Sequence, residues 1–242
     1  MIIYTEGLEG TTISLTNCGS DSNEKLLIRR DLDLKGLDTA ADNNTKTIDI
    51  TLTAAKDIVY FLLGNLTSNT DTTIKTYYDD GGWTLRETVA AATYTNDNLL
   101  ITQDLVNATQ FKVDFEGTSF SIDLACVLMG TAYTFPVNYQ YHNNRISMMR
   151  NAVQYDQRGY PYAHTINSST KYIWDVNFKM TEAQLETLIT QMEYIRYNAR
   201  PFFLYDSIVD TNYHLCFFPD NQLTAINQAA GYFEVNFKAI EL

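Results

Sequence analysis

The sequence of 242 residues is poor in the residue types that build several common functional sites. It has only three cysteines, three histidines and four prolines. Cys18, Cys126 and Cys216 are far apart and odd in number, which predicts reduced thiols and no disulfide framework. The three histidines do not stand at metal-ligand spacing from one another or from a cysteine. We therefore expect neither a metal nor a cofactor.

Positive charge and long apolar runs are also scarce. Lys and Arg number 17 against 29 Asp and Glu, which gives a formal net charge of -12. Nucleic-acid binding needs a cationic footprint, so this balance argues against it, and it suits either simple solubility or a basic partner. No segment has the apolar length of a membrane span, and the first residues lack the basic start and apolar core of a signal peptide. We expect no membrane partner and folding in a reducing cytoplasm.

The common catalytic motifs are missing. The sequence contains no P-loop, no G-x-G-x-x-G, no H-E-x-x-H, no G-x-S-x-G and no C-x-x-C. An enzyme alternative is a glycoside hydrolase, which needs two acids across the scissile bond, and it would use Asp79 or Asp80 with a distant acid. Asp31 with Asp33, and Asp79 with Asp80, all lie in turn-like sequence, where aspartate is favoured for its local hydrogen bonds. We expect a protein that is not an enzyme.

Residue types typical of β-structure are abundant. The chain has 17 tyrosines and 12 phenylalanines, which with many threonines predict a mainly β fold. Residues 47–52 and 111–115 alternate apolar and polar side chains, as a half-buried strand does. Residues 58–63 form a continuous apolar run, which predicts a strand covered on both faces. Seven or more short strands with turns between them, including 79–82, predict a β-sandwich over residues 1–132.

Residues 133–242 predict a second, β-rich domain with one amphipathic α-helix at about 181–197. Thr181 and Gln184 have the spacing of a capping box, and Pro201 prevents the helix from continuing. The strand at 172–178 alternates before this helix, and Trp174 lies on its buried side. The apolar face of the helix consists of Leu185, Leu188, Ile189, Met192 and Ile195.

Aromatic residues outside the predicted core are the candidates for binding. Trp83 follows Gly81-Gly82 on a loop, and tryptophan presents a large rigid surface on which a glycan ring can stack. Two tyrosine-rich segments are candidates for a protein interface, with ordinary loop packing as the alternative. The candidate interface residues are Tyr133, Tyr139, Tyr141, Tyr155, Tyr160 and Tyr162.

The order of these segments resembles the virion tail proteins of tailed bacteriophages that lie at the distal tail and baseplate. Residues 48–52 and 58–66 are similar to a strand pair of that family that ends in an aliphatic-Gly-x-Asn-Leu-like turn, although the usual His before Asn65 is absent. Residues 111–115 and 122–136 are similar to the strand that enters its Gly- and Pro-bearing junction. Residues 174–206 and 232–237 are similar to its strand, helix, Pro-Phe strand and closing strand.

This resemblance implies a galactose-binding-type jelly roll followed by a mixed β domain with one helix. It implies a structural component that assembles with copies of itself as a ring in the virion tail and connects the tail tube to hub or fibre proteins. The resemblance does not imply that sugar is bound, because this sandwich serves many roles. The alternative function is a carbohydrate- or receptor-binding module of a tail fibre, with Trp83 as the glycan contact.

Overall fold

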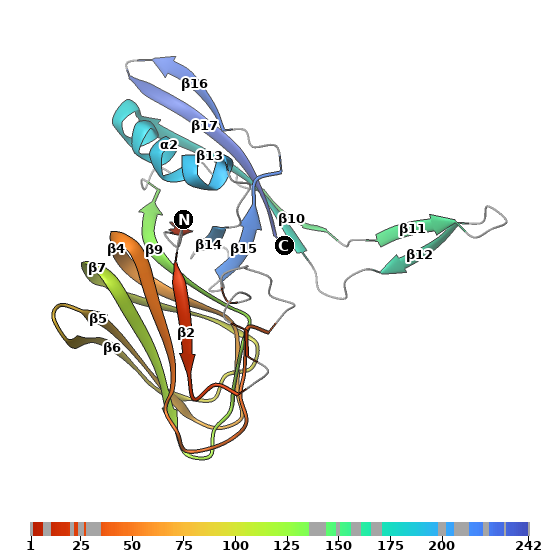
Figure 1. The fold of residues 1–242 in the computed structure, drawn as a ribbon. Coiled ribbons are helices and arrows are strands. Elements are labelled where there is room, and N and C mark those ends of the chain that lie inside the picture. The colour runs from red at the N-terminus through yellow and green to blue at the C-terminus, as the bar shows by residue number, and fades with distance from the viewer. Residues whose placement is uncertain are drawn as a thin grey trace. The chain divides into compact units, whose positions relative to one another are not determined.

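The fold of the chain is mainly β, as the sequence predicts (Figure 1). The computed structural model describes residues 2–6, 11–19, 22–23, 27, 35–135, 144–148, 151–155, 161–165, 171–197, 202–205, 213–219, 223–229 and 231–241. The chain divides into two compact units, which we describe separately. One is Tyr4–Ala132, and the other combines Met1–Ile3 with Tyr133–Leu242.

The first unit is a β-sandwich built around two long, neighbouring strands, β4 and β7. The strands up to residue 134 are β1 (Ile2–Glu6), β2 (Thr12–Thr16), β3 (Leu37–Asp38), β4 (Lys46–Ser68), β5 (Thr72–Asp79), β6 (Trp83–Ala92), β7 (Asp97–Gly117), β8 (Ile122–Leu124) and β9 (Cys126–Thr134). The first half of β4 and the second half of β7 form one sheet in the order β2-β4-β7-β5-β6. The second half of β4 pairs with the first half of β7, with β9 and with β8, which in turn pairs with β3.

The alternating patterns place the sandwich core as predicted. Ile48 and Ile50 of β4 and Phe111, Val113 and Phe115 of β7 are fully buried in one apolar cluster. Residues 58–63 of β4 are buried on both sides of the strand, apart from partly exposed position 59. The edge of the Phe61 ring packs against Phe111 at 6.0 Å between centroids, which joins the two sheets.

The structure differs from the prediction in the length of the two central strands. The runs 47–52 and 58–63 were predicted as separate strands but belong to the single strand β4, and 111–115 is only one part of the long strand β7. The β4–β7 register shifts between Thr51 and Lys56 and again further along. A β-bulge bends a strand without ending it, so an interrupted alternation marks a bend here and not a loop.

The second unit contains a sheet and the helix, which covers one face of that sheet (Figure 1). Its elements are β10 (Asn144–Met148), β11 (Asn151–Tyr155), β12 (Pro161–Thr165), β13 (Lys171–Thr181), α2 (Glu182–Tyr197), β14 (Phe202–Tyr205), β15 (Tyr213–Phe217), β16 (Thr224–Ala229) and β17 (Tyr232–Glu241). Strand β17 pairs with β13 on one side and with both β15 and β16 on the other. Strands β11 and β12 form a separate two-stranded sheet.

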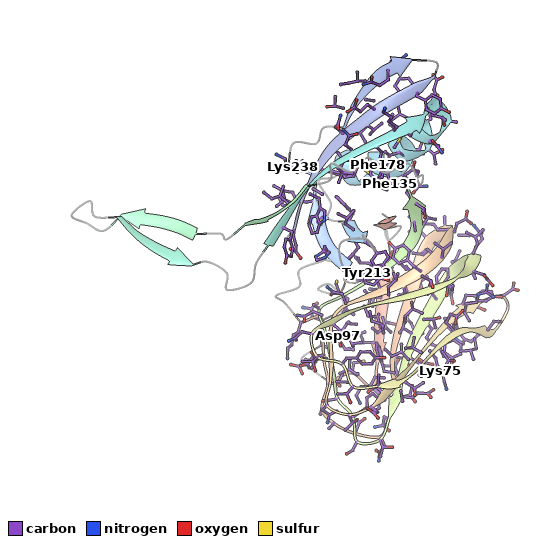
Figure 2. The ribbon with its side chains drawn as sticks, turned by 180° about the vertical axis from the view of Figure 1, so that it is seen from behind. Lys75, Asp97, Phe135, Phe178, Tyr213 and Lys238 are labelled. Carbon is purple, nitrogen blue, oxygen red and sulfur yellow. The ribbon has the colours of Figure 1, made fainter. Side chains whose placement is uncertain are left out.

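The core of the second unit lies between this sheet and α2. The strand carrying Trp174 has the predicted buried face, because Trp174, Val176 and Phe178 are all at most 2% exposed. Phe135 stacks on Phe178 with 4.2 Å between centroids, and Figure 2 labels this pair. From the helix, Leu185, Leu188 and Met192 join the same cluster. The helix described here is too short and too polar to span a membrane.

The predicted capping box begins the helix. The backbone N–H of Gln184 donates to Thr181 Oγ1 at 3.4 Å, and the backbone N–H of Thr181 donates to Gln184 Oε1 at 2.9 Å. These two bonds satisfy groups that a helix start leaves without an intrahelical partner. Thr181 is also the last residue of β13, so the same residue ends the strand and starts the helix.

We expect Thr181→Ala to lower the free energy of unfolding of the second unit by about 1 kcal/mol, because it removes the cap acceptor. Urea denaturation followed by circular dichroism measures this. Thr187→Ala is the matched control, since the Thr187 hydroxyl donates to the helical carbonyl of Ala183 and takes no part in the cap. Equal destabilisation by both variants would contradict a role for the cap.

Candidate functional site

The exposed tryptophan Trp83 stands at a hairpin turn whose geometry fixes its position. The turn joins β5 to β6 through Asp79-Asp80-Gly81-Gly82, and Trp83 is the first residue of β6. Asp79 Oδ1 accepts a hydrogen bond from the backbone N–H of Gly82 at 2.7 Å, and Gly81 has a φ of 79°, which suits glycine. The Trp83 side chain is 44% exposed.

Trp83 belongs to the outward-pointing side chains of the sheet β2-β4-β7-β5-β6, which we call the outer face. Successive residues of a strand point to opposite sides, so residues two apart share a face. Ile74 and Thr76 of β5 are buried, whereas Tyr77 between Thr76 and the turn is partly exposed. The outer face includes Ser14, Thr47, Asp49, Thr73, Lys75, Tyr77, Asp79, Trp83, Leu85, Lys112, Asp114 and Glu116.

The register of the strands sets a row of neighbours across the outer face. Asp49 of β4 lies opposite Lys112 of β7, Lys112 lies opposite Tyr77 of β5, and Tyr77 lies opposite Leu85 of β6. Neighbouring strands are about 4.8 Å apart, so the row from Asp49 to Tyr77 is about 10 Å long. Leu85 is 50% exposed at the end of this row. A short oligosaccharide spans such a length.

Lys112 holds the two aromatic rings of the outer face together. Its Nζ lies 4.3 Å from the centroid of the Tyr77 ring and 5.2 Å from that of Trp83. The ammonium group is attracted to the negative faces of both rings, which restrains their orientation. Asp114 Oδ2 lies 3.1 Å from Lys112 Nζ, and Asp114 Oδ1 accepts a hydrogen bond from Thr47 Oγ1 at 2.7 Å. A buried carboxylate therefore anchors the lysine that positions the rings.

The remaining charges of the outer face differ in how well they are paired. Lys75 Nζ lies 2.7 Å from Glu116 Oε2, and the hydrogen bond to this carboxylate raises the pKa of Lys75. The pKa of Asp49 is also raised, first by its partial burial and also by the charge of Asp114, while Lys112 opposes the shift. Asp49 makes no hydrogen bond or ion pair with any of the residues described above.

Tyr133 is the one predicted interface tyrosine whose side chain the structure describes. Tyr133 is 7% exposed, its hydroxyl donates to the carbonyl oxygen of Gln184 at 3.1 Å, and burial raises its pKa. Its side chain therefore packs in the second unit's core. Tyr155 and Tyr162 lie on the paired strands β11 and β12. Tyr139, Tyr141 and Tyr160 lie outside the described residues.

Of the carboxylates of the enzyme alternative, that of Asp79 has a structural use. Asp79 stabilises the turn through the hydrogen bond to Gly82, and the backbone N–H of Asp80 donates to the Gly82 carbonyl at 3.2 Å. Asp31 and Asp33 lie outside the described residues. Within the described ranges no three His, Cys, Asp or Glu residues gather as a metal site requires. None of the three cysteines is in a disulfide bond.

Sequence reasoning found Trp83 but missed its neighbours Tyr77 and Lys112. Two signals could have located them. The turn at residues 79–82 places 77 and 85 near each other across a hairpin, and the alternation of Phe111 and Val113 turns Lys112 outward. The sequence does not show that Tyr77 and Lys112 are neighbours, because this depends on the pairing of β5 with β7, which joins segments more than 30 residues apart.

Comparison with known proteins finds likeness only at the level of folds. No family model matches the chain, and no curated protein matches it. Among solved structures, it is similar to a pectin binding carbohydrate binding module (14% identity, TM-score 0.42, 55% of this chain and 96% of that chain). It is also similar to the family 32 CBM of NanJ from C. perfringens in complex with galactose (18% identity, TM-score 0.41, 54% of this chain and 99% of that chain). A third similar structure is the CBM32 of AlyQ in complex with 4,5-unsaturated mannuronic acid (13% identity, TM-score 0.39, 52% of this chain and 96% of that chain). At these values the likeness concerns the course of the chain and does not identify what this protein binds.

Proposed function

We propose that the protein is a non-catalytic carbohydrate-binding protein that holds a glycan on the outer face of its sandwich. The observation that carries the proposal is the exposed Trp83 ring beside Tyr77, restrained by the ammonium group of Lys112. The apolar face of a sugar ring stacks on such rings, while its hydroxyl groups need hydrogen-bonding partners close by. Asp49, Lys112 and Thr47 supply donors and acceptors on the same face.

The shape of the site favours an extended glycan over a small molecule. The outer face is the surface of an open sheet, and its side chains are arranged in a row across four strands. A ligand on such a surface is bound by stacking and hydrogen bonding along its length, without enclosure in a pocket. Catalysis by Asp79 is not part of this proposal, because its carboxylate is engaged in the turn.

Trp83→Ala should lower the affinity for the bound oligosaccharide about tenfold, or about 1.4 kcal/mol, because it removes the larger stacking ring. Isothermal titration with oligosaccharides selected on a glycan array measures this. Tyr232→Ala is the matched control, since it removes a 51% exposed aromatic side chain from the second unit. Wild-type protein that binds no glycan, or equal binding by wild type and Trp83→Ala, would refute the proposal.

A second proposed function is a structural component of a phage tail that assembles with copies of itself as a ring. The observation that favours it is strand β16, which among the described strands pairs only with β17 and has its other edge open. The strand reads Thr-Ala-Ile-Asn-Gln-Ala, without a charged residue, and Ile226 is 50% exposed. Proteins normally protect open edges with charges or prolines, so an unprotected edge suits pairing with another chain.

The separate hairpin β11–β12 gives this second function further support. It hydrogen-bonds to no other described strand, and an isolated two-stranded sheet is only marginally stable in water. Packing against another subunit would stabilise it. The interface prediction for Tyr155 and Tyr162 fits this assembly, as these residues lie on the hairpin.

Ile226→Lys should weaken self-association about tenfold or more, because it places a charge on the open edge of β16. Light scattering over a dilution series, with negative-stain electron microscopy of the same fractions, measures the assembly. Leu105→Lys is the control, since Leu105 is 61% exposed on the sandwich. A wild type that is monomeric at every concentration would rule out self-assembly through this edge.

A further inference from the structure

The charges of the outer face restrict the chemistry of the glycan that it can hold. The face carries carboxylates at Asp49, Asp79, Asp114 and Glu116, against ammonium groups at Lys75 and Lys112. Both ammonium groups are already paired, Lys112 with Asp114 and Lys75 with Glu116. The excess charge of the face is therefore negative, in keeping with the acidic chain as a whole.

Asp49 is the carboxylate of this face that is left for a ligand. Asp79 bonds to Gly82, and the carboxylates of Asp114 and Glu116 each pair with a lysine. Asp49 is half-buried and forms no hydrogen bond or ion pair within the described part of the chain. A cationic donor on a ligand would form a charge-assisted hydrogen bond with this carboxylate. Burial raises the pKa of Asp49, and the charge of Lys112 opposes this shift only in part.

The position of Asp49 relative to the rings fits one ligand that uses both. Two strand spacings, or about 10 Å, separate Asp49 from Tyr77 in the row. A sugar ring stacked on Trp83 and Tyr77 would place a later ring of the same chain above Asp49. Lys112 lies between them, but its charge is shared by Asp114 and by the two aromatic rings.

We propose that the glycan of the outer face contains free amino sugars and that Asp49 binds their ammonium groups. This rests on the proposed carbohydrate-binding function and adds the class of the ligand. A protonated glucosamine residue supplies the charged donor that Asp49 lacks, and its ring still stacks on the aromatic pair. Glycans of uronic acids are disfavoured, because they would bring carboxylates against Asp49 and Asp114.

The test compares three soluble oligomers of equal length at mildly acidic pH, where the sugar amines are protonated. These are a glucosamine oligomer, its fully N-acetylated form and a galacturonate oligomer. Wild-type protein should bind the glucosamine oligomer about tenfold more tightly than the N-acetylated one, and should bind the galacturonate oligomer weakest. Asp49→Asn should remove the preference for the free amine, with little change in binding of the N-acetylated oligomer.

Asp57→Asn is the matched control, because this exposed aspartate lies on the same strand and outside the outer face, where it bonds to Asn107. Its binding should match that of wild type.

Equal or tighter wild-type binding of the N-acetylated or galacturonate oligomer would overturn the amino-sugar inference and leave the carbohydrate function standing. Loss of preference for the amine in both variants would also overturn it. Wild-type protein that binds no glycan would overturn the carbohydrate function itself. Should Asp49→Asn fail to fold, as thermal melting would reveal, the wild-type ranking of the three oligomers still decides.

Discussion

Strands β4 and β7 run antiparallel from Lys46 opposite Phe115 to Leu66 opposite Asp97, and each contributes to both sheets of the sandwich. Their bulges bend the pair, so each of the two strands passes from one sheet to the other and contributes residues to the sandwich core along its length. The other strands attach to this pair: β2 and β9 to β4, and β5 to β7. The position of every outer-face side chain follows from this register, because a slip by one residue would turn it inward.

On the outer face, a network of charges restrains the side chains of the proposed binding surface. Asp114 is nearly buried and holds Lys112, and Lys112 in turn restrains the rings of Tyr77 and Trp83. Rings that are restrained before a ligand arrives lose little conformational freedom on binding, so more of the stacking energy contributes to affinity. The ion pairs of this face involve Asp114 and Glu116, so the carboxylate of Asp49 is available to a ligand in the proposed function. In the proposed function, stability and recognition therefore depend on different carboxylates of one sheet.

Local rules predicted the elements whose signals are contained in a few neighbouring residues. Thr181 with Gln184 predicted the helix start, and the alternation around Ile48 and Phe111 predicted core strands. The continuity of β4 and β7 was not predicted, because bulges interrupt a local pattern that long-range pairing preserves. Tyr133 shows the same limit: its composition-based assignment to an interface remains a prediction, but packing against Phe135 and the helix gives its ring a core position. Of the candidate site, the sequence located Trp83 only.

The central claim is that a glycan covers the outer face at Trp83, and tryptophan emission tests it directly. The chain has two tryptophans, of which Trp174 is 2% exposed and Trp83 is 44% exposed. Subtracting the emission of Trp83→Phe from that of the wild type isolates the signal of Trp83. During titration with a bound oligosaccharide, this signal should shift to shorter wavelength and become protected from a soluble quencher. Oligosaccharide binding that leaves the emission and quenching of Trp83 unchanged would place the ligand elsewhere and contradict the account.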